Sequence, residues 1–163
     1  MWEDGAIAAP EPKTWYVDDD GGADFTTIQA AVDAASSGET IVVKDGTYTE
    51  NVLVDKPLVI RTENGPENVT VTAAAPEKPV FDVDADAATV EGFAVRGPTN
   101  EHIAGIEIVG FDNCIVRKND CAECYNGVHL GGTAANNTVE ENCCHEISRR
   151  VISLGDTLRN NWV

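Results

Sequence analysis

An acidic turn near the start of the chain has the composition of a calcium-binding loop. Its four carboxylates surround a pair of glycines, and they belong to Asp18, Asp19, Asp20 and Asp24. Calcium prefers several oxygen ligands supplied by one flexible loop. The full twelve-residue pattern of a helix–loop–helix calcium site is not found here. A structural turn is therefore the favoured interpretation, and the alternative is a site for calcium as the cofactor.

Asp82, Glu107 and His129 form a second group that could do chemistry. Each is the middle residue of an apolar–x–apolar triplet, and Ser153 occupies the same place in a fourth triplet. If the triplets stack, the middle side chains form one outward column with about 5 Å between neighbours. Carboxyl groups about 5 Å apart suit a retaining glycosidase, and paired carboxylates also hold calcium. Any stacked pair acquires this spacing, so a solvated face is the simpler interpretation, and the three residues are catalytic candidates only if the protein is an enzyme.

The five cysteines cannot all pair within one chain. Cys121 and Cys144 occupy equivalent positions of internal repeats and should point inward. Three interpretations stay open for this pair: reduced thiols that fill the core, a disulfide, or a zinc site that adds His145. His145 should point away from the two thiols, which counts against zinc.

Four similar stretches in the second half of the chain would position these residues. They span residues 80–95, 105–121, 127–144 and 151–163. Each has an apolar–x–apolar triplet, a turn, a second apolar position, and an asparagine or aromatic residue three positions later. Repeats of about 20–25 residues with short strands are typical of a parallel β-helix. The repeats therefore predict that like positions lie directly above one another.

Several columns of the predicted stack have a structural interpretation. The asparagine column consists of Asn119, Asn142 and Asn161. Asparagine tolerates the left-handed conformation of tight turns, and its amide can bond to the coil above and below. The charged column consists of Glu91, Arg117, Glu140 and Arg159. Its signs alternate, which predicts attraction between neighbouring strands. Both columns are expected to fix the coil register.

The first half of the chain is expected to start the coil. Short apolar runs at 14–17, 41–43, 52–54, 58–60 and 69–71, separated by turn residues, predict strands. Apolar spacing over about 25–36 predicts a short amphipathic helix, with Thr26 and Gln29 as its capping box. This helix should cover the open end of the first coil. Residues 1–13 are expected to form a flexible arm, which leaves 14–163 as a single domain.

Size and charge restrict the function. With 163 residues the chain fits one domain, and its net charge of −17 excludes nucleic acid as a partner, because phosphate contacts need a basic face. No apolar run is long enough for a transmembrane helix. The first residues lack the pattern of a signal peptide, while the Asn-x-Thr triplets at Asn68 and Asn136 are compatible with export.

Particular phrases resemble a known superfamily. DFTTIQAAVDAA (24–35) and GTYTENV (46–52) resemble the N-terminal cap and first coils of pectin methylesterases, which are pectin-lyase-like proteins. With TVEGFAV (89–95) and the GI-x-I strand, they more closely resemble NosD-like or CASH-type proteins, common on archaeal and bacterial cell surfaces. The resemblance spans about 14–163 and implies a right-handed parallel β-helix. The catalytic motifs of pectin methylesterases are not found, and one Met and three scattered His do not support copper binding.

These observations favour a non-catalytic module, cell-surface or secreted, with a structural or polysaccharide-binding role. Its partners would be a polysaccharide or neighbouring surface proteins, and no residues are assigned to carbohydrate binding. The last coil has no capping helix, so self-association end to end, or continuation into a longer solenoid, is expected. The alternative is a polysaccharide-cleaving enzyme of the pectin-lyase-like kind, or a fragment of one.

Overall fold

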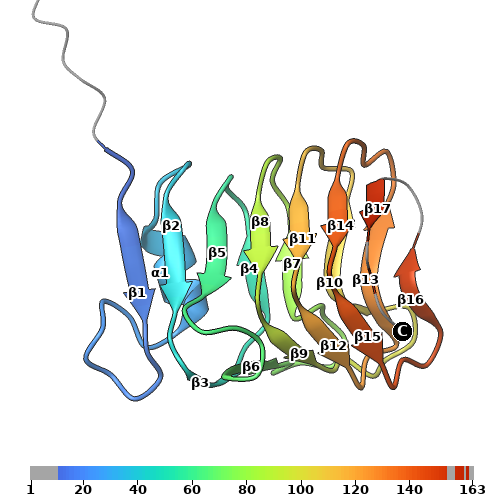
Figure 1. Cartoon of the computed structure of the whole chain (residues 1–163), viewed down its shortest axis with the longest axis horizontal. Coiled ribbons are helices and arrows are strands. Elements are labelled where there is room, and N and C mark those ends of the chain that lie inside the picture. Colours follow the sequence, from blue (N-terminus) through green and yellow to red (C-terminus); the bar gives the residue numbers. More distant parts are fainter. Residues whose placement is uncertain (1–10, 154–156, 160, 162–163) are drawn as a thin grey trace, which may run out of the picture.

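The computed structural model describes residues 11–153, 157–159 and 161, which form a parallel β-helix (Figure 1). The first sheet has the order β1 (Thr14–Val17), β2 (Thr40–Val43), β5 (Val59–Thr62), β8 (Thr89–Glu91), β11 (Ile115–Arg117), β14 (Thr138–Glu140) and β17 (Thr157–Arg159). The second has the order β3 (Gly46–Thr49), β6 (Val69–Thr72), β9 (Ala94–Arg96), β12 (Asp120–Ala122) and β15 (Cys143–His145). The third has the order β4 (Val52–Val54), β7 (Phe81–Val83), β10 (Ala104–Val109), β13 (Asn126–Gly131) and β16 (Arg150–Ser153).

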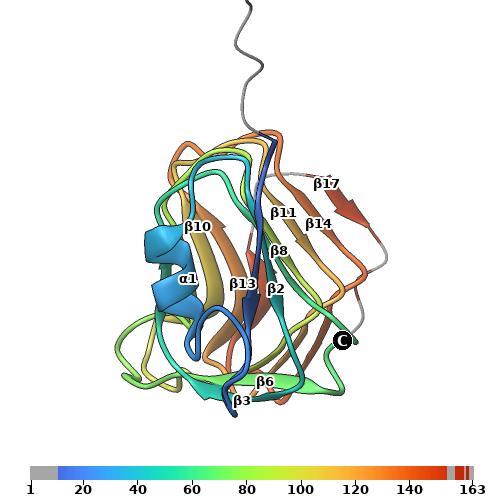
Figure 2. The ribbon, with the colours of Figure 1, turned by 90° about the vertical axis from the view of Figure 1, so that its left-hand side faces the viewer.

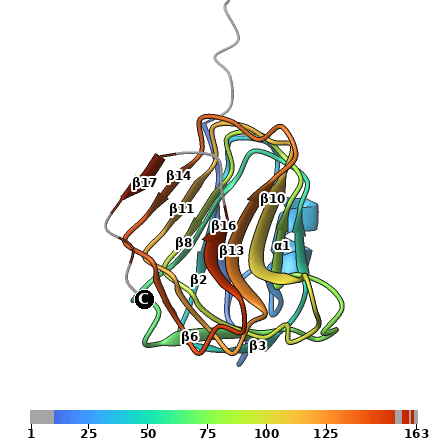
Figure 3. The same cartoon turned by 90° about the vertical axis from the view of Figure 1, so that its right-hand side faces the viewer.

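Each strand from β2 to β14 pairs in parallel with the strand three places further along the chain, and β1 pairs with β2. Each run of three consecutive strands from β2 onward therefore makes one coil. End-on views show the three sheets enclosing one interior (Figure 2, Figure 3). The β-helix fold expected from the repeats is confirmed.

The strand register puts like residues above one another. Val90 lies opposite Val116, which lies opposite Val139. In the second sheet, Cys121 lies between Val95 and Cys144. Buried positions alternate with more exposed ones along most strands, as in β4 and β7. The apolar columns thus fill the interior, and the residues between them face outward.

One strand was not expected. The apolar runs predict no strand between 41–43 and 52–54, yet residues 46–49 form β3. Tyr48 points into the core with 3% of its surface exposed, and its hydroxyl donates a hydrogen bond to the Lys44 carbonyl at 3.1 Å. A side chain at Gly46 would collide with the Asp19 carboxylate, so glycine is needed here for close approach.

Helix α1 (Ile28–Ala34) is shorter than the expected 25–36, and it begins differently. Its N-cap is Thr27, whose hydroxyl accepts a hydrogen bond from the Ala30 N–H, so the predicted capping box of Thr26 and Gln29 is wrong. The Glu50 carboxylate instead accepts hydrogen bonds from the N–H groups of Ile28 and Gln29 at 2.9 and 3.0 Å. A residue of the first coil therefore satisfies donors at the helix start.

Hydrogen bonds from side chains cover the open edges of the first coil. Helix α1 lies against β1, β2 and β4 at the N-terminal end of the stack (Figure 1). The Gln29 amide pairs with the edge strand β4, accepting from the Leu53 N–H at 2.8 Å and donating to the Leu53 carbonyl at 3.4 Å. On the edge strand β3, the Asp19 carboxylate accepts from the Thr47 N–H at 2.9 Å. As expected, the helix caps the coil, and one residue of the acidic turn does the same for a second sheet.

The asparagines at the third repeat position form a buried ladder. Asn142 Oδ1 accepts hydrogen bonds from the Asn119 N–H at 3.0 Å and from Asn119 Nδ2 at 3.1 Å. Asn161 Oδ1 makes the same two contacts with Asn142, and Asn119 Oδ1 accepts from the Phe93 N–H. Asn119 and Asn142 are at most 1% exposed. The ladder satisfies turn amides that no strand partner reaches.

The charged column lies on the outward face of the first sheet. Glu91 is opposite Arg117, and Arg117 is opposite Glu140, while β17 places Arg159 next in register. Arg117 and Glu91 form an ion pair of 2.8 Å, and Lys118 approaches the same Glu91 carboxylate at 3.3 Å.

Two expectations concern residues outside the described part of the chain. Of the flexible arm expected at 1–13, residues 1–10 lie outside it. The uncapped last coil involves residues 154–156, 160 and 162–163, which also lie outside it.

Replacing Gln29 with alanine should lower the free energy of unfolding by about 1–2 kcal/mol, because the edge strand β4 loses both hydrogen bonds to the Gln29 amide. Urea denaturation followed by circular dichroism would measure the change. Ser37→Ala, an exposed change after the helix, is the control and should stay within about 0.5 kcal/mol of wild type. Equal stability of Gln29→Ala and Ser37→Ala would contradict the edge-capping role.

Candidate functional site

The third sheet brings Asp82, Glu107 and His129 into one outward column. Glu107 lies opposite Asp82 on one side and His129 on the other, and Ser153 follows His129 in register. His129 Nδ1 and Glu107 Oε2 form a hydrogen bond of 2.9 Å. Leu53, 42% exposed, precedes Asp82 in the column. The column is thus a strip of acidic, imidazole and apolar groups.

Asp82 is the perturbed acid of this strip. Burial, and then the negative charges of Asp84 and Glu107, raise the pKa of Asp82 to about 6. A carboxyl with a raised pKa beside a second carboxyl group is the arrangement that general acid catalysis uses. The same pairing arises in any solvated stack of carboxylates, so it identifies a candidate site and no reaction.

The acidic turn uses its carboxylates locally. Asp18 forms an ion pair with Lys44 at 3.3 Å and accepts a hydrogen bond from the Asp20 N–H. Asp19 accepts a hydrogen bond from the edge strand β3. Asp24 accepts one from the Tyr16 N–H at 2.9 Å. These contacts provide a structural role for three of the four residues. Calcium binding at this turn stays a prediction.

Cys121 and Cys144 lie in the interior, opposite one another in register and fully buried. They are free thiols, as are the other three cysteines. The neighbouring Cys144 thiol, together with burial, raises the pKa of Cys121 well above its ordinary value. His145 is exposed on the outer face. The structure therefore does not bring Cys121, Cys144 and His145 together.

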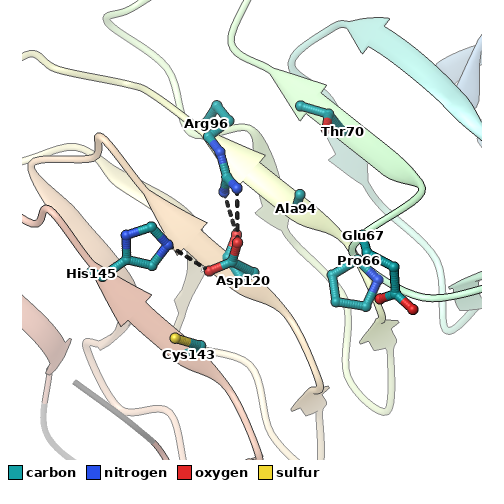
Figure 4. Close-up of a pocket in the computed structure, with 8 residues that line it drawn as sticks. All are labelled: Pro66, Glu67, Thr70, Ala94, Arg96, Asp120, Cys143 and His145. Atoms are coloured by element: carbon teal, nitrogen blue, oxygen red, sulfur yellow. Dashed lines mark hydrogen bonds and ion pairs between the residues drawn. The ribbon is translucent and has the colours of Figure 1, made fainter.

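A second cluster, which sequence reasoning missed, lies on the outer face of the second sheet (Figure 4). It lies in a pocket of about 480 Å³. The residues that line this pocket are Pro66, Glu67, Thr70, Ala94, Arg96, Asp120, Cys143 and His145. Within it, donor atoms of Asp120, Cys143 and His145 all lie within 4.8 Å of one another.

Strand register explains how these side chains meet. Asp120 lies opposite Cys143, while Ala122 lies between Arg96 and His145. Because the Ala122 side chain is small, the two long side chains can lean across the strand towards Asp120 (Figure 4). Arg96 donates to Asp120 Oδ2 at 2.8 Å and to the Asp120 carbonyl at 2.7 Å. His145 Nε2 approaches Asp120 Oδ1 at 2.9 Å.

The electrostatics of the pocket do not favour a free thiolate. Burial, followed by the charge of Asp120, raises the pKa of Cys143. A thiol in this state is a poor nucleophile on its own. The cluster can instead supply sulfur, nitrogen and oxygen ligands to one cation.

The signal for this cluster was present in the sequence. If Cys121 and Cys144 point inward, strand alternation makes their neighbours Asp120, Cys143 and His145 point outward. The zinc interpretation took the two cysteines of the inward column, whereas the outward Cys143 shares a face with His145.

The strand pairing defines this chain as a parallel β-helix protein. Its sequence is also similar to that of a known protein. No protein-family profile matches the chain. A cell surface glycoprotein of Methanothermus fervidus is 35% identical over 97 residues, which are 58% of this chain. The chain spans only 15% of the length of that relative. Among solved structures, pectin methylesterase from Aspergillus niger is similar with a TM-score of 0.45 and 13% identity, over 94% of this chain and 86% of that one.

The raised pKa of Asp82 predicts a pH-dependent stability. A folded-state pKa of about 6, above the unfolded value of 3.8, means that the folded state binds more protons between these values. Stability should therefore fall as pH rises from about 4 to about 6, by about 1 kcal/mol because the carboxyl stays partly solvated.

Asp82→Asn should remove this contribution, so the variant gains stability relative to wild type above pH 6 and not at pH 4. Urea unfolding at the two pH values measures it, with the exposed Glu77→Gln as the charge-matched control. A gain that is the same at both pH values would show that the Asp82 carboxyl is not perturbed.

Proposed function

We propose that this chain is a structural β-helix module of a cell-surface protein. The observation that carries the proposal is the match over 97 residues to a protein named cell surface glycoprotein. That relative is much longer than the matched segment. A solenoid that adds coils without changing its cross-section suits the role of a spacer within a long surface protein. The finer resemblance to NosD-like or CASH-type surface proteins is part of this proposal.

The charge of the chain supports exposure to solvent and salt. A net charge of −17 keeps the outer faces hydrated and repels other acidic surfaces. Within the described residues there is no helix of the length and apolar character that a membrane span requires. We infer partners among neighbouring surface proteins, and strand pairing with them at the β3 and β4 edges is disfavoured, because Asp19 and Gln29 cover those edges.

Protease treatment of intact cells that make the protein tests the location. Trypsin should release peptides ending at exposed basic residues such as Lys13, at a rate comparable to a known surface protein, while a cytoplasmic marker stays intact. Protection of the protein until the cells are lysed would overturn the proposal.

Polysaccharide binding on the third sheet is a second candidate, and cleavage is its enzymatic form. The observation that favours it is the outward strip of Leu53, Asp82, Glu107 and His129. Exposed Leu53 offers an apolar contact, and the acids and imidazole offer hydrogen bonds to hydroxyl groups. If the strip is catalytic, Asp82 with its raised pKa would be the acid and Glu107 the carboxylate partner.

Affinity electrophoresis in gels containing acidic or neutral polysaccharides, with a reducing-sugar assay, separates these roles. A binding face predicts retardation that weakens at least about 10-fold in Glu107→Gln, where the hydrogen bond to His129 is altered. An enzyme predicts new reducing ends that Glu107→Gln abolishes. Glu77→Gln, exposed and outside the strip, is the control. Neither retardation nor cleavage across the panel would exclude this second candidate.

A further inference from the structure

The pocket on the second sheet contains three different metal-ligand types on one rigid face. Asp120 comes from β12, and Cys143 and His145 come from β15. Because β12 and β15 are hydrogen-bonded neighbours, the three backbone positions are fixed by strand register and not by a loop. One carboxylate oxygen, one sulfur and one imidazole nitrogen lie within 4.8 Å of one another.

The Asp120 carboxylate has one oxygen engaged and one oxygen unsatisfied. Oδ2 accepts a hydrogen bond from Arg96 at 2.8 Å. Oδ1 is buried and has no hydrogen-bond partner of acceptable geometry. His145 Nε2 lies only 2.9 Å from Oδ1, although the two atoms form no hydrogen bond. A buried carboxylate oxygen without a hydrogen-bond partner needs a physical explanation, and an ion bound by Oδ1 and Nε2 together would provide one.

We propose that Asp120, Cys143 and His145 bind one divalent transition-metal ion, with zinc as the ion that fits best. Zinc takes sulfur, nitrogen and oxygen ligands at about 2.0–2.3 Å in a tetrahedron, so its donor atoms lie about 3–4 Å apart. The donors need only small side-chain rotations to reach that arrangement from a spread within 4.8 Å. A thiolate and a carboxylate also balance the charge of the ion, and the sulfur and imidazole donors disfavour calcium, which takes oxygen ligands.

Arg96 is a positioning residue for this site. Its guanidinium holds Asp120 Oδ2 and the Asp120 carbonyl, which leaves Oδ1 directed at the cluster. Outer hydrogen bonds of this kind orient metal-ligating carboxylates. Arg96 and the metal therefore use different oxygens and do not compete.

Three protein ligands leave a fourth position open. Thr70 and Glu67 line the same pocket as the three ligands. Sites with three protein ligands and an open position hold water or an anionic group of a ligand there. The site is thus distinct from the strip on the third sheet, and it does not depend on the cell-surface role.

Cobalt(II) titration of the reduced protein, in excess calcium to saturate nonspecific acidic sites, tests the proposal. We expect one equivalent of cobalt, a thiolate-to-cobalt charge-transfer band, and the intense visible bands of a tetrahedral site. Zinc should displace the cobalt and abolish both signals. Cys143→Ser should remove the charge-transfer band, and His145→Gln should weaken binding more than about 100-fold, beyond the 10- to 100-fold cost of losing an outer contact.

The controls separate this site from general acidity and from misfolding. Cys114→Ser and His129→Gln alter a buried cysteine and the other paired histidine away from the pocket, and both should bind cobalt as wild type does. Arg96→Gln should weaken binding by about 10-fold while keeping the charge-transfer band. A wild-type protein without that band, or equal loss in His145→Gln and His129→Gln, would overturn the proposal. The wild-type spectrum is decisive by itself: if it lacks the charge-transfer band, the proposal is overturned even where a variant fails to fold.

Discussion

Parallel pairing between successive coils is the constraint on which the structure depends. A coil cannot satisfy its own backbone groups, so its strand N–H and carbonyl groups must bond to the coils above and below. At the turns, where strand pairing ends, the amides of Asn119 and Asn142 take over the same task. Any slip in register would put apolar columns on the outer face and leave these buried amides unsatisfied. The interior therefore fixes the strand register, and the strand register fixes which side chains lie next to one another on the outer faces.

The contacts on the outer faces follow from the strand register. Glu107 and His129 meet on the third sheet, and Asp120 and His145 meet on the second, although the members of each pair are more than twenty residues apart in sequence. Neither pair needs a loop to bring it together. Fixed strands hold polar groups with less positional freedom than loops do, which is the property that a binding site requires. The same scaffold thus carries two separate candidate sites on different faces.

Much of this architecture could be predicted from sequence because its signals are local. The apolar triplets around Asp82, Glu107 and His129 repeat with turns between them, and that pattern determines both fold and register. The helix start could not be predicted, because Glu50, which accepts hydrogen bonds there, belongs to the first coil and lies more than twenty residues after the helix start. The role of Asp19 likewise depends on a strand that was not anticipated. The metal-ligand cluster required the inward–outward alternation to be applied to the neighbours of the cysteines, and the orientation of Asp120 depends on a side-chain contact that no spacing reveals.

The hydrogen bonds that cover one end of the stack lie at the beginning of the chain. Gln29 and Asp19 cover the edges of β4 and β3, and no later coil is needed for those contacts. Equivalent valines in later coils are 26 and 23 residues apart, at Val90, Val116 and Val139. Duplication or deletion of such a segment within a gene would therefore lengthen or shorten the rod by whole coils, without new chemistry at its sealed end. Evolution can adjust the reach of such a protein in steps of about 4.8 Å per coil.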